Sequence, residues 1–145
     1  MKVVFRRATL DDLEAIIELC NECFEENTSI DYAKKIYIET ENDDNQIYLI
    51  GLIGNQVVAH AKITVIPTIY EEMNTYSILN HVCVKPEYRR FGIATKLLEE
   101  CERISKEKKC VKMELWSMNF RQPAHECYKN YGFNIDDAKF FSKEI

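Results

Sequence analysis

A basic turn that leads into a helix-like segment is the part of the chain best suited to binding an anion. The turn and helix start read Arg89, Arg90, Phe91, Gly92, Ile93, Ala94 and Thr95. Free backbone N–H groups at a helix start point at whatever lies above it, and the helix macrodipole adds roughly half a positive charge there. Gly92 and Ala94 keep the backbone bare enough for a phosphate to approach, and the two arginines add charge-assisted donors. The segment therefore predicts an anion site, although alone it also fits an ordinary helix start beside solvated arginines.

The elements that must position this turn are predicted from the spacing of apolar residues. Helices are expected at about residues 11–25, 30–39, 92–106 and 123–131, and strands at about 3–6, 47–52, 57–66, 76–84, 111–116 and 139–142. Ser29 is expected to cap the second helix, and Gly54 with Asn55 supplies a turn that tolerates positive φ. The order β-α-α-β-β-β-α-β-α-β predicts an α+β, or mixed-sheet α/β, domain.

Length and composition are typical of a globular protein, and we expect a single domain over residues 1–145. Hydrophobic residues make up 46% of the 145 and charged residues 30%, with only 4 Gly and 3 Pro and no linker-like tract. The longest strongly apolar run, residues 47–53, is far short of the roughly 20 residues of a membrane span. The first residues lack a secretory signal pattern, which predicts a cytoplasmic protein. A net charge of -5 disfavours nucleic acid as the main ligand.

The six cysteines lie inside periodic segments rather than in loops. Thiols in a cytosolic protein are kept reduced, so we expect free cysteines and no disulfides. Cys20 and Cys23 share a helix at i, i+3 spacing without a second pair of ligands, which favours ordinary packing over a zinc site. No metal site is predicted. Two nucleotide-binding patterns, G-x-x-x-x-G-K-S/T and G-x-G-x-x-G, are also missing from the sequence.

Two runs of the chain share the spacing of a known pair of motifs. Residues 89–94 match Q/R-x-x-G-x-G/A, with Ala94 at the last position. Residues 119–133 follow N-x-x-A-x-x-x-Y-x-x-x-G-F, except that Ala124 lies five rather than three residues after Asn119. In this order, separated by a helix and a strand, the two runs resemble the signatures of the GCN5-related N-acetyltransferase (GNAT) family. The resemblance covers most of the chain, from Arg6 to Phe133.

This resemblance implies a fold, an activity and a set of binding residues. The implied fold has a central mixed, mostly antiparallel sheet of six to seven strands flanked by about four helices. The implied activity moves an acetyl group from acetyl-CoA to a primary amine of a small molecule or peptide by direct attack. The residues implied to bind acetyl-CoA are Val82, Cys83, Val84, Arg89, Arg90, Phe91, Gly92, Ile93, Ala94, Thr95, Asn119 and Ala124. A backbone N–H near Val82 or Cys83 would donate to the oxyanion, and the Cys83 side chain is interpreted as a core residue.

Tyr128 is the catalytic acid that the resemblance implies. A phenol with a pKa near roughly 10 stays protonated at neutral pH and can donate to a thiolate whose acid has a pKa near roughly 8.5. The alternative role for Tyr128 is packing in the core, as expected for the nearby aromatic residues Tyr131 and Phe133.

The general base is left open between His81, His60 and water. Relatives often carry an acidic residue on the strand before the anion turn, whereas this chain has His81 there, with an unperturbed pKa near roughly 6.5. A symmetric hairpin around residues 67–74 would pair position 66 with 75 and place His60 opposite His81. A bulge or a one-residue slip would separate them, and either histidine could equally be a satisfied residue of the sheet.

The acceptor amine and the oligomeric state are not identified by the sequence. The amine is expected to bind near the first two helices and the loop at residues 67–75. Acidic residues there could attract a cation or could simply form a solvated face; they are Glu25, Glu26, Asp31, Glu71 and Glu72. The resemblance also allows a homodimer through the C-terminal strands. A second function remains open, namely a catalytically silent acyl-CoA sensor or regulatory module on the same fold.

Overall fold

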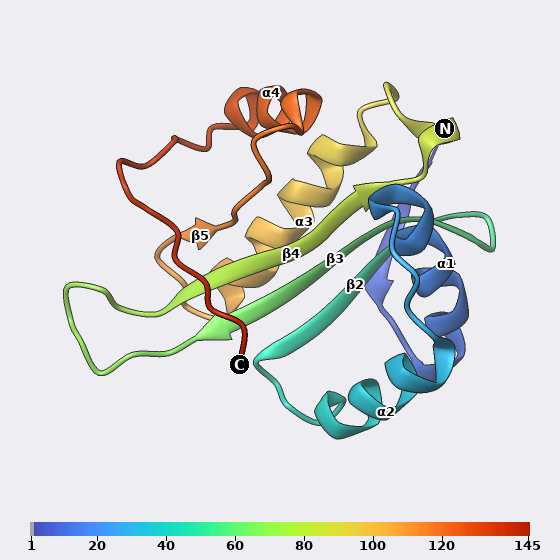
Figure 1. Ribbon diagram of the computed structural model, residues 1–145, viewed down its shortest axis with the longest axis horizontal. Helices are drawn as coiled ribbons and strands as arrows, with labels where there is room; N and C mark the ends of the chain where they lie inside the picture. The colour runs from blue at the N-terminus through green and yellow to red at the C-terminus, as the bar shows by residue number, and fades with distance from the viewer. Residues whose placement is uncertain (1) are drawn as a thin grey trace.

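A five-stranded mixed sheet forms the centre of the computed structural model, which describes residues 2–145 (Figure 1). Its strands lie in chain order as β1 (Val4–Arg7), β2 (Gln46–Ile53), β3 (Gln56–Ile66), β4 (Tyr76–Val84) and β5 (Met113–Glu114). The first four pair antiparallel, and β5 is parallel to β4. The α+β class and the mixed, mostly antiparallel sheet are therefore confirmed.

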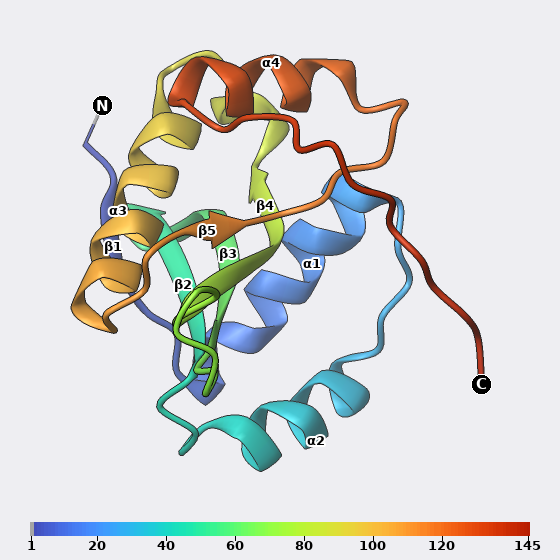
Figure 2. The same ribbon diagram turned by 90° about the vertical axis from the view of Figure 1, so that its left-hand side faces the viewer.

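The predicted strand number of six to seven was wrong, because the C-terminal part of the sheet is shorter than the sequence indicated. The strand expected at residues 111–116 is reduced to Met113–Glu114, and residues 139–142 form no strand. Since β5 pairs with β4 at two positions only, it offers no long edge to which another strand could add. The last residues instead run away from the sheet (Figure 2), with Phe140 stacked on Trp116 at 5.1 Å between ring centroids.

Four helices accompany the sheet, in agreement with the expectation. They are α1 (Leu13–Phe24), α2 (Ile30–Thr40), α3 (Ile93–Glu107) and α4 (Gln122–Tyr131). A 3-10 turn at Leu10–Asp12 precedes α1. The predicted cap of α2 is confirmed, because Ser29 Oγ accepts a hydrogen bond from the Tyr32 N–H at 3.2 Å. Gly54 has the positive φ expected of its turn, at 59°.

The sheet carries a hydrophobic core on each face. On one face α3 packs against β3 and β4 through residues such as Leu97, Leu98 and Cys101, all fully buried. On the other face α1 packs against the same strands through Leu13, Ile16 and Leu19. Figure 2 shows these helices on opposite sides of the sheet. The two cores fix the ends of β4 and the start of α3 relative to α1.

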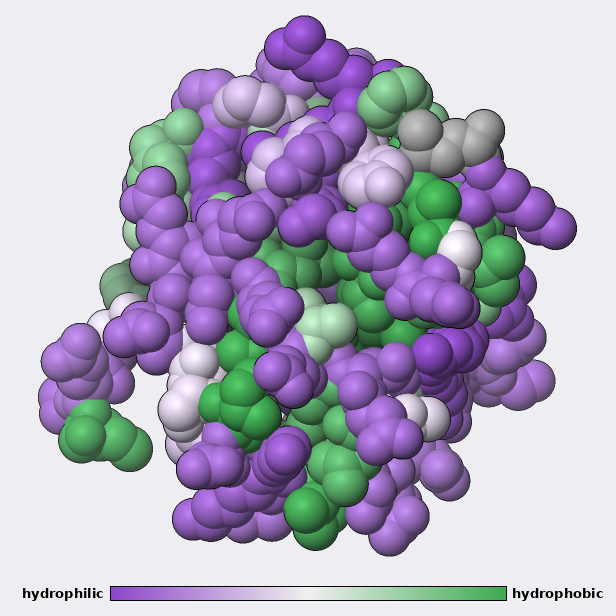
Figure 3. Space-filling model, turned by 90° about the vertical axis from the view of Figure 1, so that its right-hand side faces the viewer, coloured by the Kyte–Doolittle hydropathy of each residue, from purple (hydrophilic) through white to green (hydrophobic). Residues whose placement is uncertain are grey.

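The face of the molecule drawn in Figure 3 is mainly hydrophilic. In Figure 3, polar residues cover most of one face, and apolar residues gather in the hollows between them. None of the helices in residues 2–145 is long and apolar enough to cross a membrane. All six cysteines are free, as predicted.

A β-bulge in β4 overturns the predicted pairing of the two histidines. Position 66 pairs with Tyr76 rather than with residue 75, and the register then shifts by one residue between His60 and Lys62. As a result, His60 lies opposite Cys83, and His81 has a φ of 51°. The one-residue offset at the hairpin and the bulge together separate the two imidazoles in register.

Candidate active site

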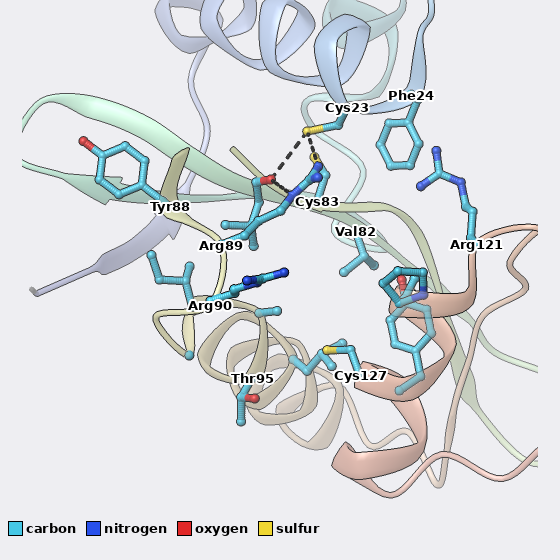
Figure 4. Close-up of a pocket in the computed structure, with 18 residues that line it drawn as sticks. Cys23, Phe24, Val82, Cys83, Tyr88, Arg89, Arg90, Thr95, Arg121 and Cys127 are labelled. Atoms are coloured by element: carbon cyan, nitrogen blue, oxygen red, sulfur yellow. Dashed lines mark hydrogen bonds between the residues drawn. The ribbon is translucent and has the colours of Figure 1, made fainter. Parts of the chain in front are cut away.

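A cavity of about 530 Å³ lies where the end of β4, the start of α3 and α4 meet (Figure 4). The predicted site residues that line it are Val82, Cys83, Val84, Arg89, Arg90, Gly92, Ile93, Ala94, Thr95, Ala124 and Tyr128. The remaining predicted residues, Phe91, Asn119 and His81, lie outside its lining. Phe91 is 57% exposed. Asn119 uses its backbone carbonyl to accept a hydrogen bond from Gln122 Nε2 at 2.7 Å, just before α4 begins.

The cavity opens because β4 and β5 diverge. The two strands pair at Ser77 with Met113 and at Ile78 with Glu114 and nowhere else in the part of the chain that the structure describes. Beyond Ile78, the backbone of β4 on that side has no strand partner as far as Val84. Apart from the Val84 carbonyl, which accepts from Arg89 Nε and Cys23 Sγ, the backbone N–H and C=O groups along this edge have no strand to pair with and can bond a ligand that enters between the strands.

The start of α3 presents bare backbone to the cavity. Gly92 occupies the N-cap position with φ 78° and ψ 9°, and no side chain caps the helix there. A Cβ placed on Gly92 would meet no heavy atom within 4 Å, so the space above it is open. The first N–H groups of α3 lack intrahelical partners, and the macrodipole makes them attractive to an anion. These residues fit the diphosphate of a coenzyme A molecule.

The two arginines of the turn have different surroundings. Arg89 folds back onto β4, where its Nε donates to the Val84 carbonyl at 3.1 Å and its Nη2 to Cys23 Sγ at 3.7 Å. Arg90, held at φ 70°, extends its guanidinium into the cavity (Figure 4). Within residues 2–145 the Arg90 side chain makes no hydrogen bond or salt bridge, which leaves its donors available to an anion.

Tyr128 contributes a protonated hydroxyl to the same cavity. Its ring packs edge-on against Phe133, with 5.8 Å between the centroids. Burial is the main cause that raises the pKa of Tyr128 to about 12, so the phenol keeps its proton at neutral pH. No hydrogen bond to the hydroxyl is present among the described residues, and none of their buried side-chain polar atoms is left without a partner. The hydroxyl is therefore accessible to solvent and free to bond a ligand, on a residue that lines the cavity.

His81 lies next to the cavity rather than in it. The bulge directs its imidazole toward Glu26, whose carboxylate oxygens lie 2.9 and 3.1 Å from Nε2. Its ring also contacts Phe24, which lines the cavity, at 4.8 Å between centroids. On its other side His81 lines a second cavity of about 200 Å³ between α1, α2 and the sheet, together with Asn80 and Glu26. The histidine and its carboxylate partner thus stand between the two cavities.

His60 lies on the second cavity but is poorly suited to take a proton. It is 4% exposed, and its Nδ1 lies 2.8 Å from the Leu49 carbonyl oxygen. Because a carbonyl can only accept, Nδ1 is the protonated nitrogen. Burial lowers the pKa of His60 to about 4. These properties are those of a neutral histidine that is satisfied within the sheet.

Sequence reasoning missed several residues of the cavity wall. They are Cys23, Phe24, Tyr88, Leu98, Arg121, Pro123 and Cys127. Arg121 places its guanidinium 4.4 Å above the ring of Phe24, which joins α1 to the turn before α4. The position of Arg121 inside the second motif was a usable signal. Cys23 gave none, because its spacing from Cys20 is equally typical of a packed helix face.

Comparisons with known proteins agree with this geometry. The family model described as Acetyltransferase (GNAT) family matches residues 13–133. No curated protein matches the chain. Three similar solved structures are a transcriptional regulator from Bacillus halodurans C-125, a predicted acetyltransferase with acetyl-CoA from Clostridium acetobutylicum, and an aminoglycoside antibiotic 6′-N-acetyltransferase from Acinetobacter baumannii.

The likeness of these structures extends over the whole chain. The first has a TM-score of 0.89 at 20% identity, covering 99% of this chain and 100% of its own. The second has a TM-score of 0.78 at 22% identity, covering 98% and 96%. The third has a TM-score of 0.81 at 19% identity, covering 99% of each chain. The TM-scores show that these proteins share the fold of this chain. Identities this low show the fold alone.

Proposed function

Because the chain belongs to the GNAT acetyltransferase family, we propose that it transfers an acetyl group from acetyl-CoA to a primary amine. The observation that supports this most strongly is that one cavity contains both the bare start of α3 and the Tyr128 hydroxyl. An anion anchor and a proton donor are two of the requirements for releasing a thiolate from a thioester.

Binding is assigned to the start of α3 and to the diverging edge of β4. The N–H groups after Gly92 and the free guanidinium of Arg90 hold the diphosphate. The unpaired backbone of β4 near Val82 hydrogen-bonds the arm that extends from it, and one of its N–H groups donates to the carbonyl oxygen as negative charge develops there. When bound, acetyl-CoA supplies the activated thioester.

Tyr128 is assigned the role of general acid. With a pKa of about 12 it remains protonated throughout the neutral range and donates its proton to the departing sulfur. The proton is needed when the thiolate leaves, so we place the contribution of Tyr128 at that step.

His81 is assigned the role of general base, with Glu26 orienting it. An imidazole held by a carboxylate at 2.9 Å is suited to accept a proton from an incoming ammonium group or from a water that relays it. The second cavity, about 200 Å³ in volume and bordered by Glu26, is proposed to admit the amine. The acidic partner then both attracts the cationic acceptor and positions the base.

The experiment measures thiol release from acetyl-CoA with a panel of amines, peptides and aminoglycosides, alongside calorimetry of acetyl-CoA binding. Tyr128→Phe removes the donated proton and keeps the ring against Phe133. We expect turnover with one acceptor at least, reduced about 100-fold or more in Tyr128→Phe while acetyl-CoA binds with unchanged affinity.

Two outcomes would contradict this assignment in different ways. Tight binding of acetyl-CoA without turnover on the whole panel would favour a silent acyl-CoA sensor on the same fold. Full turnover by Tyr128→Phe would remove the tyrosine from the mechanism and leave the acetyltransferase assignment intact. Tyr131→Phe is the matched control, because that hydroxyl donates to Glu102 at 3.1 Å and lies outside the cavity.

A further inference from the structure

Three cysteines meet where α1 packs against β4, at one wall of the large cavity. Cys20 and Cys83 are buried in the core between α1 and the sheet, at 5% and 7% exposure. Cys23, one helical turn after Cys20, is half-buried and packs against the same core. Cys23 and Cys83 both line the cavity assigned to acetyl-CoA, and Figure 4 shows their sulfur atoms directed toward one another.

The surroundings of Cys23 favour its thiolate. Arg89 Nη2 donates to its Sγ at 3.7 Å, and this cation favours the thiolate; the protonated thiol can instead donate to the Val84 carbonyl oxygen at 3.6 Å. A hydrogen bond from the Cys83 thiol, followed by the charge and hydrogen bond of Arg89, lowers the pKa of Cys23 to about 7 against the opposing effects of burial and Glu22.

The neighbouring groups make Cys83 less suited than Cys23 to ionise. Hydrogen bonds with Cys20 and Cys23, together with burial, raise the pKa of Cys83 far above its ordinary value. Glu22, on the same helix as Cys23, is partly neutralised by Lys85, whose Nζ lies 3.7 Å away. Cys23 has the Arg89 guanidinium beside its sulfur and is less buried than Cys83, so of the two thiols Cys23 is the better placed to act as a nucleophile.

We propose that Cys23 is a thiol–disulfide exchange site for the disulfide form of coenzyme A, and that the resulting mixed disulfide closes the acetyl-CoA site. This inference rests on the proposed function, because the coenzyme anchor at α3 is what brings the disulfide to Cys23. The Cys23 thiolate attacks one sulfur of the coenzyme A disulfide and forms a new S–S bond. The original S–S bond breaks, and the second coenzyme A leaves as a thiolate that takes a proton from water.

The mixed disulfide is expected to persist until a reductant removes it. The nearest protein thiol that could attack it is that of Cys83, which is protonated and buried and is therefore a poor nucleophile. The attached coenzyme occupies the same cavity that acetyl-CoA needs. Oxidising conditions that convert coenzyme A to its disulfide would thus switch off acetyl transfer reversibly.

The test incubates the reduced full-length protein with coenzyme A disulfide at pH 7, digests it, and locates adducts by mass spectrometry. We expect one coenzyme A on Cys23, formed at least ten times faster than on Cys127. Cys127 is the internal control, because it lines the same cavity while burial raises its pKa. Acetyl-CoA should protect Cys23, dithiothreitol should reverse the modification, and Cys127→Ser should still be modified at Cys23.

A second measurement follows the rate of modification of Cys23 against pH with dipyridyl disulfide, an uncharged probe. We expect a midpoint near pH 7 that moves upward in Cys83→Ala, because the hydrogen bond to the thiolate is lost. A thiol of ordinary pKa, roughly 8.5, is only a few per cent ionised at pH 7, compared with about half for Cys23. If Cys83 only packs in the core, the midpoint should be the same in Cys83→Ala as in the wild-type protein.

The outcomes separate this inference from the proposed function. Binding of acetyl-CoA by calorimetry with Cys23 inert to both disulfides would overturn the exchange site and leave the acetyltransferase assignment standing. Reaction with dipyridyl disulfide at a midpoint near pH 7, without a preference for coenzyme A disulfide and without protection by acetyl-CoA, would overturn coenzyme binding in this cavity. That second result would refute both proposals.

Discussion

Replacing Gly92 by alanine separates two roles that the structure gives to this position. Gly92 sits at the N-cap of α3 in a left-handed conformation, with φ 78° and ψ 9°. The Cβ that alanine adds would meet no protein atom within 4 Å. Any cost to the fold must therefore come from the backbone conformation, and any cost to binding from the methyl group standing in the open space above the helix start.

The two costs can be given magnitudes. A non-glycine residue in the left-handed region costs roughly 1–2 kcal/mol, and replacing glycine recovers about 0.4–1 kcal/mol from the unfolded chain. We expect Gly92→Ala to lower the free energy of unfolding by about 1 kcal/mol. A methyl group that prevents one charge-assisted hydrogen bond to a phosphate costs about 1.5–3 kcal/mol, so the Kd for acetyl-CoA should rise roughly 10- to 100-fold.

Gly54→Ala is the matched control for the backbone effect. Gly54 also has a positive φ, 59°, and an added Cβ there also meets nothing within 4 Å. It lies in the turn between β2 and β3 and takes no part in lining the large cavity. Urea unfolding should show a similar loss of stability in both variants, whereas calorimetry should show weakened acetyl-CoA binding in Gly92→Ala alone. Wild-type affinity in Gly92→Ala would refute the bare-backbone anchor.

Three further predictions concern the stability of the fold. Burial keeps the pKa of His60 near 4 in the folded protein, compared with roughly 6.5 in the unfolded chain. The free energy of unfolding should therefore fall by up to about 1.4 kcal/mol per pH unit as the pH drops from 6.5 to 4. Urea titrations of His60→Asn should lack that slope. Hydrogen bonding to Arg6 lowers the pKa of Asp12 to about 2, so its contribution, present above roughly pH 4, should vanish as the pH falls toward 2, and Asp12→Asn should show no such loss. Ser77 and Ser105 share a buried hydrogen bond of 2.8 Å, so Ser105→Ala should cost about 1–3 kcal/mol, and the double replacement by alanine should cost less than the sum of the two single ones.

The regular elements were predictable because their signals are local. The helix pattern around Leu97 and the alternation along residues 57–66 predicted α3 and β3 to within one residue at each end. Gly92 and the arginines beside it predicted an anion-binding turn, because the residues that leave the helix start without large side chains are neighbours in the sequence. Most of the residues expected to bind the coenzyme do line one cavity. Local chemistry thus indicated much of the lining of this cavity.

The parts that could not be predicted depend on pairings between distant segments. The bulge at His81 follows from how β4 packs on β3, and one extra residue in the ladder moved His60 opposite Cys83. The partner of His81, Glu26, lies 55 residues away, beyond the end of α1. The strand expected at residues 139–142 does not form, and β5, with two paired residues, offers it only a short edge. Such outcomes are decided by tertiary packing.

The irregularities of β4 account for two parts of the candidate site, the open backbone edge and the position of His81. A regular strand would pair with β5 along its length and would bury the edge on which the coenzyme arm is proposed to bind. It would also leave His81 in the sheet and away from Glu26. The early divergence of β5 exposes the backbone of β4 toward the large cavity, and the bulge turns His81 toward the second cavity. The two features lie within four residues of each other along β4. The fold gives up hydrogen bonds of the sheet at this point, and that loss is what creates two adjacent cavities with β4 between them.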